Sequence, residues 1–304
     1  MDRNRWTVLD YLRVGFGRFP KGFLVGIDVT FRCNLNCVHC YFKHQGYHSE
    51  LSTNEWVSRL QALKDRGLPL YTCGWLGGEP LLRPDVIDAG RKFFKSNVIF
   101  TNGTHELPDW PDSTFVVSIP GDKTAYCDLT GGNEAVYATV KEHASRPDLD
   151  VIVAYCITRR NAASIANFLK EWRETGVKGV FFEFYTPSKG EDNRLWLDWQ
   201  ERDRVVDELL QLKKPWGDFI YNKSLELRLM KTAPLQRILA CCHAREAQLS
   251  LDPMGNPKSP CQLGPEADCS RCGCILPIWS FLLWRKRFLL LAFAEGVWRQ
   301  IRGL

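Results

Sequence analysis

The chain has 304 residues, and its 40 Lys and Arg against 35 Asp and Glu give a formal net charge of +5. Hydrophobic residues make up 45% and aromatic residues 12% of the sequence, which indicates a globular protein with a large core. So weak a positive charge does not argue for nucleic-acid binding, and we expect no nucleic-acid partner. The first residues lack the apolar run of a secretory signal peptide, so we expect a cytoplasmic protein whose twelve cysteines favour metal over disulfides.

Apolar stretches alternate with helix signals along the first two thirds of the chain. Residues 1–22 mix basic and aromatic side chains and predict one short amphipathic helix. Six strands are predicted over residues 23–31, 70–75, 97–101, 114–119, 150–156 and 179–185. Helices are predicted over 84–94, 133–144 and 161–175, and one more runs from the capping box of Ser52 and Glu55 to about residue 65. Residues 102–111 are too short and too rich in turn residues for a helix, so we expect a loop.

This alternation predicts a parallel sheet covered by helices. In such folds the loops that follow the strands converge at the carboxyl ends of the strands, and the chemistry gathers there. We therefore expect the residues after each strand to form the site.

Three cysteines, Cys33, Cys37 and Cys40, follow the first predicted strand at C-x3-C-x2-C spacing. Cysteine thiolates are the protein ligands of iron-sulfur clusters, and three of them hold a cubane with one iron left open for a ligand. Zinc is the alternative, with His39 or His44 offered as the fourth ligand.

This loop resembles the signature of the radical S-adenosylmethionine (radical SAM) enzymes, with His39 as the ring-bearing residue before the last cysteine. Asp28 and Thr30 stand where many members carry an acidic residue and a threonine. The resemblance implies an α/β fold, a partial (β/α)6 TIM-type barrel of the radical SAM kind, and two cofactors, a 4Fe-4S cluster and SAM. It also implies that SAM is cleaved reductively to a 5'-deoxyadenosyl radical.

Further resemblances follow the second, third and fourth predicted strands. The backbone of Gly77 and Gly78 can approach a ligand closely because glycine has no side chain. In this family a Gly-Gly-Glu motif contacts the amino group of SAM, and Glu79 is expected to orient that backbone. The cofactor-binding residues that the resemblance implies are His39, Gly77, Gly78, Glu79, Pro80, Asn102 and Ser118. Pro120 replaces an aspartate of the fourth-strand motif, and Asp122 is the nearest candidate to substitute for it.

Candidates for substrate contact lie on the last two predicted strands. Glu183 is the most suggestive of them, because a carboxylate between two phenylalanines needs a partner if it is buried. Tyr155 and Tyr185 are weaker candidates, since a strand tyrosine is more often a packing residue.

The second half of the chain is rich in cysteine. A helix is predicted over residues 199–212, then a linker around Pro215, then a hairpin over residues 248–261. The segment resembles in part the SPASM/Twitch extension of radical SAM enzymes, which implies a second 4Fe-4S cluster. Its expected ligands are Cys242, Cys261, Cys269, and Cys272 or Cys274. A zinc knuckle is the alternative, because Cys-x2-Cys pairs suit tetrahedral zinc.

The tail, residues 275–304, is apolar but is interrupted by Arg285, Lys286 and Arg287, which argues against a membrane span. It predicts either a peripheral helix at the inner face of the membrane or a helix that packs on the barrel or in a dimer. The apolar residues considered for lipid contact are Trp279, Phe281, Leu282, Trp284, Phe288, Leu289 and Phe293.

These observations divide the chain into five segments and suggest one function. The segments are residues 1–22, a barrel core of 23–190, a helical linker of 191–240, a cysteine-rich region of 241–274 and the tail of 275–304. The predicted function is a radical SAM enzyme that acts on a peptide or on a lipid or isoprenoid, with flavodoxin or ferredoxin as the reductant. The rival is a non-catalytic iron-sulfur or zinc protein that carries electrons or serves as a scaffold.

Overall fold

The computed structural model describes residues 22–192 and 194–284. Residues 1–21, within the predicted N-terminal helix, and residues 285–304 of the predicted tail therefore lie outside the described residues.

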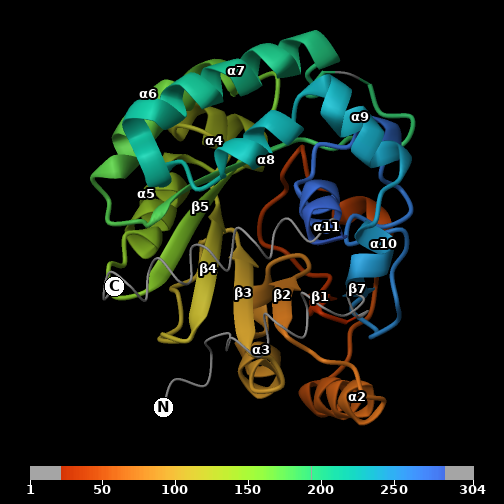
Figure 1. Ribbon diagram of the computed structural model, residues 1–304. Helices are drawn as coiled ribbons and strands as arrows, with labels where there is room; N and C mark the ends of the chain where they lie inside the picture. The colour runs from red at the N-terminus through yellow and green to blue at the C-terminus, as the bar shows by residue number, and fades with distance from the viewer. Residues whose placement is uncertain (1–21, 193, 285–304) are drawn as a thin grey trace, which may run out of the picture.

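The centre of the molecule is one parallel sheet of seven strands in the order β6-β5-β4-β3-β2-β1-β7 (Figure 1). Each strand pairs in parallel with its neighbours, so that Asp28 at the end of β1 lies opposite Leu76 at the end of β2. The strands are β1 (Leu24–Asp28), β2 (Thr72–Leu76), β3 (Ser96–Thr101), β4 (Ser113–Ser118), β5 (Asp150–Ile157), β6 (Gly179–Phe184) and β7 (Gln248–Leu251).

Six of these strands match the predicted alternation, and the α/β class is confirmed. The sheet is open within the described residues, with β6 and β7 as its two edges. We did not predict β7 as a sheet strand, because residues 248–261 read only as a hairpin. The hairpin turn does form, since Leu251 and Pro257 make an antiparallel bridge, but β7 also pairs in parallel with β1.

Helices cover the sheet and close its ends. They are α2 (Thr53–Asp65), α3 (Pro84–Arg91), α4 (Lys123–Thr130), α5 (Glu134–Ala144), α6 (Ile165–Arg173), α7 (Trp199–Trp216), α8 (Ser224–Leu229), α9 (Thr232–Ala240), α10 (Ala244–Ala247) and α11 (Leu276–Trp284). The predicted capping box at Ser52 and Glu55 opens α2, and a second one at Asp198 and Glu201 opens α7. In Figure 1, α6 and α7 arch over one end of the sheet, and α10 and α11 lie beside β7.

Two helical predictions need correction. Helix α4 was missed, although Asp122 caps its first turn and Gly131, at a φ of +72°, ends it. Helix α7 does not stop before Pro215 but runs through it to Trp216, without the hydrogen bond that an N–H at this position would donate to the carbonyl of Gln211. The segment expected as a helical linker, residues 191–240, also holds the short helices α8 and α9.

The core lies between the sheet and the helices. Trp75 on β2 and Trp56 on α2 are at most 1% exposed, and Phe115 on β4 and Phe168 on α6 are fully buried. Burying one such side chain contributes about 1.5–3 kcal/mol, which explains why both faces of the strands are apolar. Some of the polar residues that remain buried, Asp28, Thr30, Glu79 and Thr101, lie at the carboxyl ends of strands or in the loops that follow them.

The described part of the predicted tail packs on this core. In α11, Ile278 and Leu282 are at most 2% exposed, and the Trp279 indole donates to Glu226 at 2.8 Å and lies against Phe181. Of the two alternatives predicted for the tail, Trp279 and Leu282 therefore fit packing on the core rather than contact with lipid. Phe288, Leu289 and Phe293 lie outside the described residues. No helix in residues 22–192 or 194–284 is both long and apolar enough to span a bilayer.

Candidate metal centres

The loop after β1 presents Cys33, Cys37 and Cys40 at the carboxyl end of the sheet. Its middle is held against the end of α4, where the backbone N–H of Val38 donates to the carbonyl of Leu129 at 2.9 Å. Lys43 Nζ donates to the carbonyl of Cys37 at 2.8 Å. The unpredicted helix α4 is therefore one wall of the predicted cluster loop.

Glu50 fastens the base of this loop. Its carboxylate accepts the hydroxyl of Thr30 at 2.5 Å and forms ion pairs with Arg32 at 2.7 Å and Arg83 at 3.0 Å. Burial opposes the ionised carboxylate, but the hydrogen bonds from Thr30, Arg32 and Arg83 dominate and lower the pKa of Glu50. Thr30 thus acts here through Glu50, a residue that sequence patterns did not single out.

The three thiols lie close enough to affect one another. Burial and, after it, the neighbouring Cys40 and Cys33 raise the pKa of Cys37 to about 12. Burial, followed by Glu79 and Cys40, raises the pKa of Cys33. All twelve cysteines are free. Three mutually repelling sulfurs in one loop fit a cationic iron core, which would stabilise their thiolate forms.

The Gly77–Gly78 turn crosses directly over the start of the cysteine loop. The Gly78 N–H donates to the Thr30 carbonyl at 2.9 Å, and the Glu79 N–H donates to the Arg32 carbonyl at 2.8 Å. A Cβ at Gly78 would lie 2.0 Å from the Arg32 carbonyl oxygen, and one at Gly77 would lie 2.4 Å from that of Thr30. Neighbouring protein backbone thus leaves no room for a side chain at either glycine, whereas the sequence suggested only close approach of a ligand.

Glu79 joins the second and third loops. Its buried carboxylate accepts from the Leu81 N–H at 2.9 Å, the Thr101 hydroxyl at 2.7 Å and the Asn102 N–H at 2.7 Å. Burial raises the pKa of Glu79, and these hydrogen bonds oppose the rise. Glu79 thus connects the turn after β2 to the end of β3. Pro80, the next residue, is buried and starts a short 3-10 turn.

Asn102 connects the end of β3 to the cysteine loop. Its side-chain amide lies 3.8 Å from Cys33 Sγ and donates to the Asn34 side-chain oxygen at 2.9 Å. Asn34 in turn donates to the Thr104 hydroxyl at 2.8 Å. The structure therefore brings together the first three predicted motifs.

The fourth motif contributes less. Ser118 is exposed at the carboxyl end of β4. Asp122, the candidate to substitute for the missing aspartate of this motif, caps α4, and its carboxylate accepts from the Ala125 N–H at 3.0 Å. The carbonyl of Pro120 accepts from the Asn161 side chain at 2.9 Å.

His39 is half-buried beside the end of α4. Burial lowers its pKa to about 4, and a contact with the backbone of Leu129 opposes that. The ring is therefore neutral at physiological pH and holds the loop to α4. His44, the other zinc candidate, is exposed.

The three substrate-contact candidates have separate surroundings. The Tyr155 hydroxyl is buried and donates to the Asn161 carbonyl at 2.7 Å, and the Tyr185 hydroxyl donates to Glu191 at 2.5 Å. Both placements favour packing roles. Glu183 differs, because burial raises its pKa to about 7 while contacts from Ile275 and Cys274 oppose the rise. It lies between the end of β6 and the cysteine-rich region.

A buried ion pair links β1 to the cysteine-rich region. Lys258 Nζ lies 2.5 Å from Asp28 Oδ2, and the Gln262 amide donates to Asp28 Oδ1 at 2.6 Å. Lys258 also lies over the rings of Tyr41 and Phe42, at 5.8 and 5.6 Å. Burial raises the pKa of Asp28 to about 6, although Lys258 opposes the rise.

The second half of the chain forms a cavity of about 410 Å³ between α9, α10 and the start of α11. Six cysteines line it, Cys241, Cys242, Cys261, Cys269, Cys272 and Cys274. Cys241 Sγ donates to the Arg237 carbonyl at 3.3 Å and is exposed. The other five are the predicted ligands. No three His, Cys, Asp or Glu side chains of the described residues form a ready site for a single metal ion.

This cavity is fixed to the barrel through Gly273. A Cβ at Gly273 would lie 2.1 Å from the Phe184 carbonyl oxygen, so the segment between Cys272 and Cys274 lies directly against the end of β6. The Phe184 N–H donates to the Gly273 carbonyl at 3.1 Å, and the Gly273 N–H donates to the Thr186 hydroxyl at 2.8 Å. The two cysteine sites therefore belong to one continuous structure.

The chain resembles known proteins in a family motif region, in sequence and in fold. Residues 27–113 match the family described as the Radical SAM superfamily. An AdoMet-dependent heme synthase of Methanosarcina barkeri is 25% identical over 207 residues, 63% of this chain and 58% of that protein. The antilisterial bacteriocin subtilosin biosynthesis protein AlbA of Bacillus subtilis is 24% identical over 225 residues, 65% of this chain and 49% of that protein. The chain thus spans about half the length of these curated relatives.

Solved structures share the fold. SuiB of Streptococcus suis bound to S-adenosylmethionine has a TM-score of 0.61 at 15% identity, over 79% of this chain and 60% of that chain. The structure of anSMEcpe with bound AdoMet and the Cp18Cys peptide has a TM-score of 0.60 at 16% identity, over 86% of this chain and 80% of that chain.

Proposed function

The chain belongs to the radical SAM superfamily, and from that premise we propose that it cleaves S-adenosylmethionine reductively to start radical chemistry on a substrate. The observation that carries the proposal is the convergence of three loops at the carboxyl end of the sheet. Glu79 ties the Gly-Gly turn to Asn102, and Asn102 reaches Cys33. Such a joined arrangement is what a site needs to hold a cluster and a cofactor in one orientation.

The roles of the residues follow from this arrangement. Cys33, Cys37 and Cys40 would ligate three irons of a 4Fe-4S cluster and leave the fourth for SAM. When bound, the cluster and SAM supply the 5'-deoxyadenosyl radical. The Gly77–Gly78 backbone would contact the amino group of SAM, with Pro80 completing the turn. His39 would fix the loop against α4, and Ser118 would lie toward the ribose.

We propose a second 4Fe-4S cluster in the cysteine-lined cavity, bound by Cys242, Cys261, Cys269, and Cys272 or Cys274. The cavity volume and the gathering of the five predicted ligands around it support this. A zinc knuckle is the competing occupant. A flavodoxin or ferredoxin would supply electrons. The cytoplasm, where thiols stay reduced, suits this chemistry.

The substrate that we propose is a peptide. A relative named for the biosynthesis of the bacteriocin subtilosin supports this class. A tetrapyrrole is the second candidate, because another relative is named as a heme synthase. The lipid or isoprenoid alternative was based on the basic and aromatic termini, and the described part of the tail packs on the core instead. Residues 1–21 and 285–304 of these termini lie outside the described residues.

The test is anaerobic reconstitution followed by assay. The reduced protein should convert SAM to methionine and 5'-deoxyadenosine, measured by chromatography. A variant with Cys33→Ala, Cys37→Ala and Cys40→Ala should lose this activity and only part of its iron. A wild-type protein with a verified reducible cluster that yields no 5'-deoxyadenosine, with or without a candidate peptide or tetrapyrrole, would favour the non-catalytic rival.

A further inference from the structure

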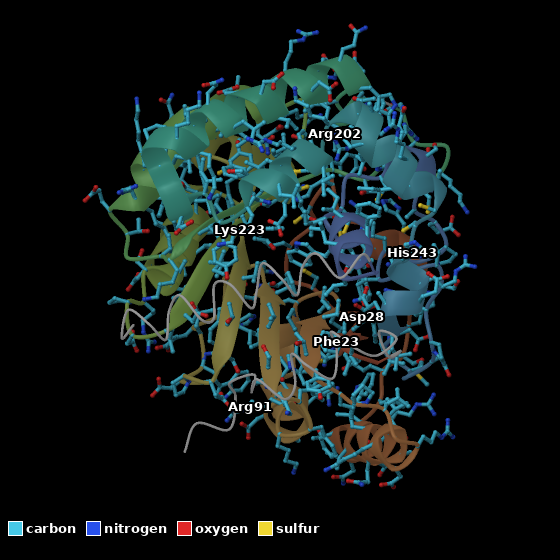
Figure 2. All side chains as sticks on the ribbon, in the orientation of Figure 1. Phe23, Asp28, Arg91, Arg202, Lys223 and His243 are labelled. Atoms are coloured by element: carbon cyan, nitrogen blue, oxygen red, sulfur yellow. The ribbon has the colours of Figure 1, made fainter. Side chains whose placement is uncertain are left out.

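Asp28 contacts the chain on both sides of Cys261, one of the proposed ligands of the second cluster. Lys258, three positions before Cys261, has its Nζ 2.5 Å from Asp28 Oδ2. Gln262, one position after Cys261, donates from its side-chain amide to Asp28 Oδ1 at 2.6 Å. Both oxygens of this carboxylate are therefore bound to residues that flank one cysteine. Figure 2 shows Asp28 on the side of the sheet where the label of His243 marks the cysteine-rich region.

Gly26, two positions before Asp28 and on the same face of β1, leaves the space that Gln262 occupies. A Cβ at Gly26 would lie 2.0 Å from Gln262 Oε1 and 2.6 Å from Gln248 Nε2. Because the amide of Gln262 is held by Asp28, a side chain at Gly26 would push this amide away from the carboxylate. Gly26 and Asp28 together thus form a socket on β1 for the residue that follows Cys261.

The chain after the first three cysteines holds the same segment, residues 258–263. Lys258 Nζ lies 5.8 Å from the centre of the Tyr41 ring. The Gln45 side-chain amide donates to the carbonyl of Leu263 at 3.3 Å. Segment 258–263 therefore contacts the chain both before and after the first cysteine loop.

The contacts of this segment with Asp28 are buried. Asp28 is fully buried and Gln262 is 6% exposed, so a partner lost from either place would leave a polar group in the interior. Cys261 lines the cavity of the second site, and its carbonyl accepts from the Gly264 N–H at 3.0 Å. The position of Cys261 at the cavity is thus set by the contacts of its two flanks.

Building on the proposed second cluster, we propose that Asp28 is a positioning residue of that cluster. It fixes Cys261 through Lys258 and Gln262, in a socket that Gly26 keeps open. The sequence places Asp28 in the motif of the first site, whereas its contacts extend its role to the second. Residues that orient a metal ligand typically contribute 10-fold to 100-fold to metal affinity, so loss of these contacts should make the second cluster labile.

The parent protein for the test is the full chain with the three cysteines of the first loop replaced by Ala, so that only the second site binds iron. Gly26→Ala should speed the loss of iron to a chelator about tenfold or more and change the paramagnetic resonance spectrum of the dithionite-reduced cluster. Gly74→Ala is the matched control, because Gly74 pairs with Gly26 across β2 and β1. Its Cβ would meet only side-chain atoms, of Leu76 at 3.2 Å and Phe100 at 3.3 Å. This control should keep the rate and the spectrum of the parent.

Two further variants of the same parent remove the contacts without adding bulk. Gln262→Leu removes the hydrogen bond to Asp28 and leaves the ion pair. The double variant Asp28→Asn with Lys258→Met removes the ion pair and leaves no buried charge. Both should lose iron faster than the parent, as Gly26→Ala does. Arg59→Met is their control, because Arg59 Nε donates to the Gly255 carbonyl at 3.0 Å in the turn of the same hairpin, and it should keep the rate of the parent.

An iron loss and a spectrum like those of the parent in Gln262→Leu would overturn the role of Asp28, whatever Gly26→Ala does. If Gln262→Leu does not fold, the double variant decides in the same way. Equally fast iron loss in Arg59→Met or Gly74→Ala would also overturn the role, because the effect would then come from general loosening of the structure. A parent without iron, or with zinc alone, would instead refute the proposed second cluster.

Discussion

Lys258 and Asp28 form an ion pair of 2.5 Å whose side chains are 2% and 0% exposed. Asp28 ends the strand that leads into the cysteine loop, and Lys258 lies three positions before Cys261. This pair therefore fastens the cysteine-rich region to the barrel next to the proposed SAM cluster.

We predict that Lys258→Met destabilises the protein by about 3–5 kcal/mol at about pH 8, because it leaves the Asp28 carboxylate buried without its cation. Burial already raises the pKa of Asp28 to about 6 in the presence of Lys258, and losing Lys258 raises it further. A folded-state pKa above the unfolded value means that the native state binds the proton more tightly. The deficit should therefore shrink as pH falls to about 5.

Urea unfolding of wild type and variant at the two pH values measures this deficit. The double variant Lys258→Met with Asp28→Asn is the control, since it has no buried carboxylate and should lose the pH dependence. A deficit in Lys258→Met that is equal at both pH values would contradict the assignment of Asp28 as the responsible group.

Glu79→Gln should destabilise the protein by about 1–3 kcal/mol and weaken SAM cleavage. Both oxygens of Glu79 accept from donors, so either orientation of the amide places an NH2 group against an N–H or a hydroxyl. Thr101→Val is the comparison variant, because it leaves two of the three donors to Glu79; since it also removes the acceptor of the Gly103 N–H, it should cost about 1–3 kcal/mol without placing an NH2 group against a donor. Equal unfolding midpoints for wild type and Glu79→Gln would show that the stability of the protein does not depend on the negative charge of the Glu79 carboxylate.

The sheet and the motif loops could be predicted because each has a local signal. Alternating apolar and helical patterns located six strands, and the spacing of the first three cysteines located the loop. Strand β7 carries no such signal, since its four residues pair with β1 through a contact that spans most of the chain. Helix α4 was not predicted because its apolar pattern is weak. Its end signals, the cap at Asp122 and the stop at Gly131, are nevertheless present in the sequence.

The contributions of Lys258 and Glu50 could not be predicted for a related reason. Each is a charged residue that an exposed surface would also accommodate, and only tertiary contact buries it. Pro215 misled the prediction of α7 because a proline usually marks the end of a helix, whereas α7 continues through it to Trp216. The apolar tail pattern fitted lipid and core equally, and the contact between Trp279 and Glu226 decides for the core in the described residues.

Gly78→Ala should lower iron incorporation at the first site in addition to any loss of SAM affinity. Gly78 does not have a positive φ, so alanine is compatible with its backbone conformation. The obstacle is a steric clash, because the new Cβ would lie 2.0 Å from the Arg32 carbonyl oxygen. Arg32 adjoins Cys33, so its displacement moves the first ligand. Iron and sulfide per chain after reconstitution provide the measurement.

Gly46→Ala is the matched control for this loop. Gly46 has a φ of +68°, and a Cβ there would meet nothing within 4 Å, so the variant should bear only a backbone cost of about 1 kcal/mol. It should keep its iron. Full iron in Gly78→Ala with weakened SAM binding would favour a ligand contact as the reason for this glycine.

Helix α11 should behave as part of the core. Ile278 is 1% exposed, so Ile278→Ala should cost about 2–5 kcal/mol through the lost contacts and the cavity left behind. Trp279→Phe keeps an aromatic ring against Phe181 but leaves the mostly buried Glu226 carboxylate without the indole donor, at a cost of about 1–3 kcal/mol. Urea midpoints measure both, and sedimentation with anionic vesicles is the companion experiment. A lipid-binding α11 would give the opposite pattern, with vesicle sedimentation reduced and both unfolding midpoints unchanged.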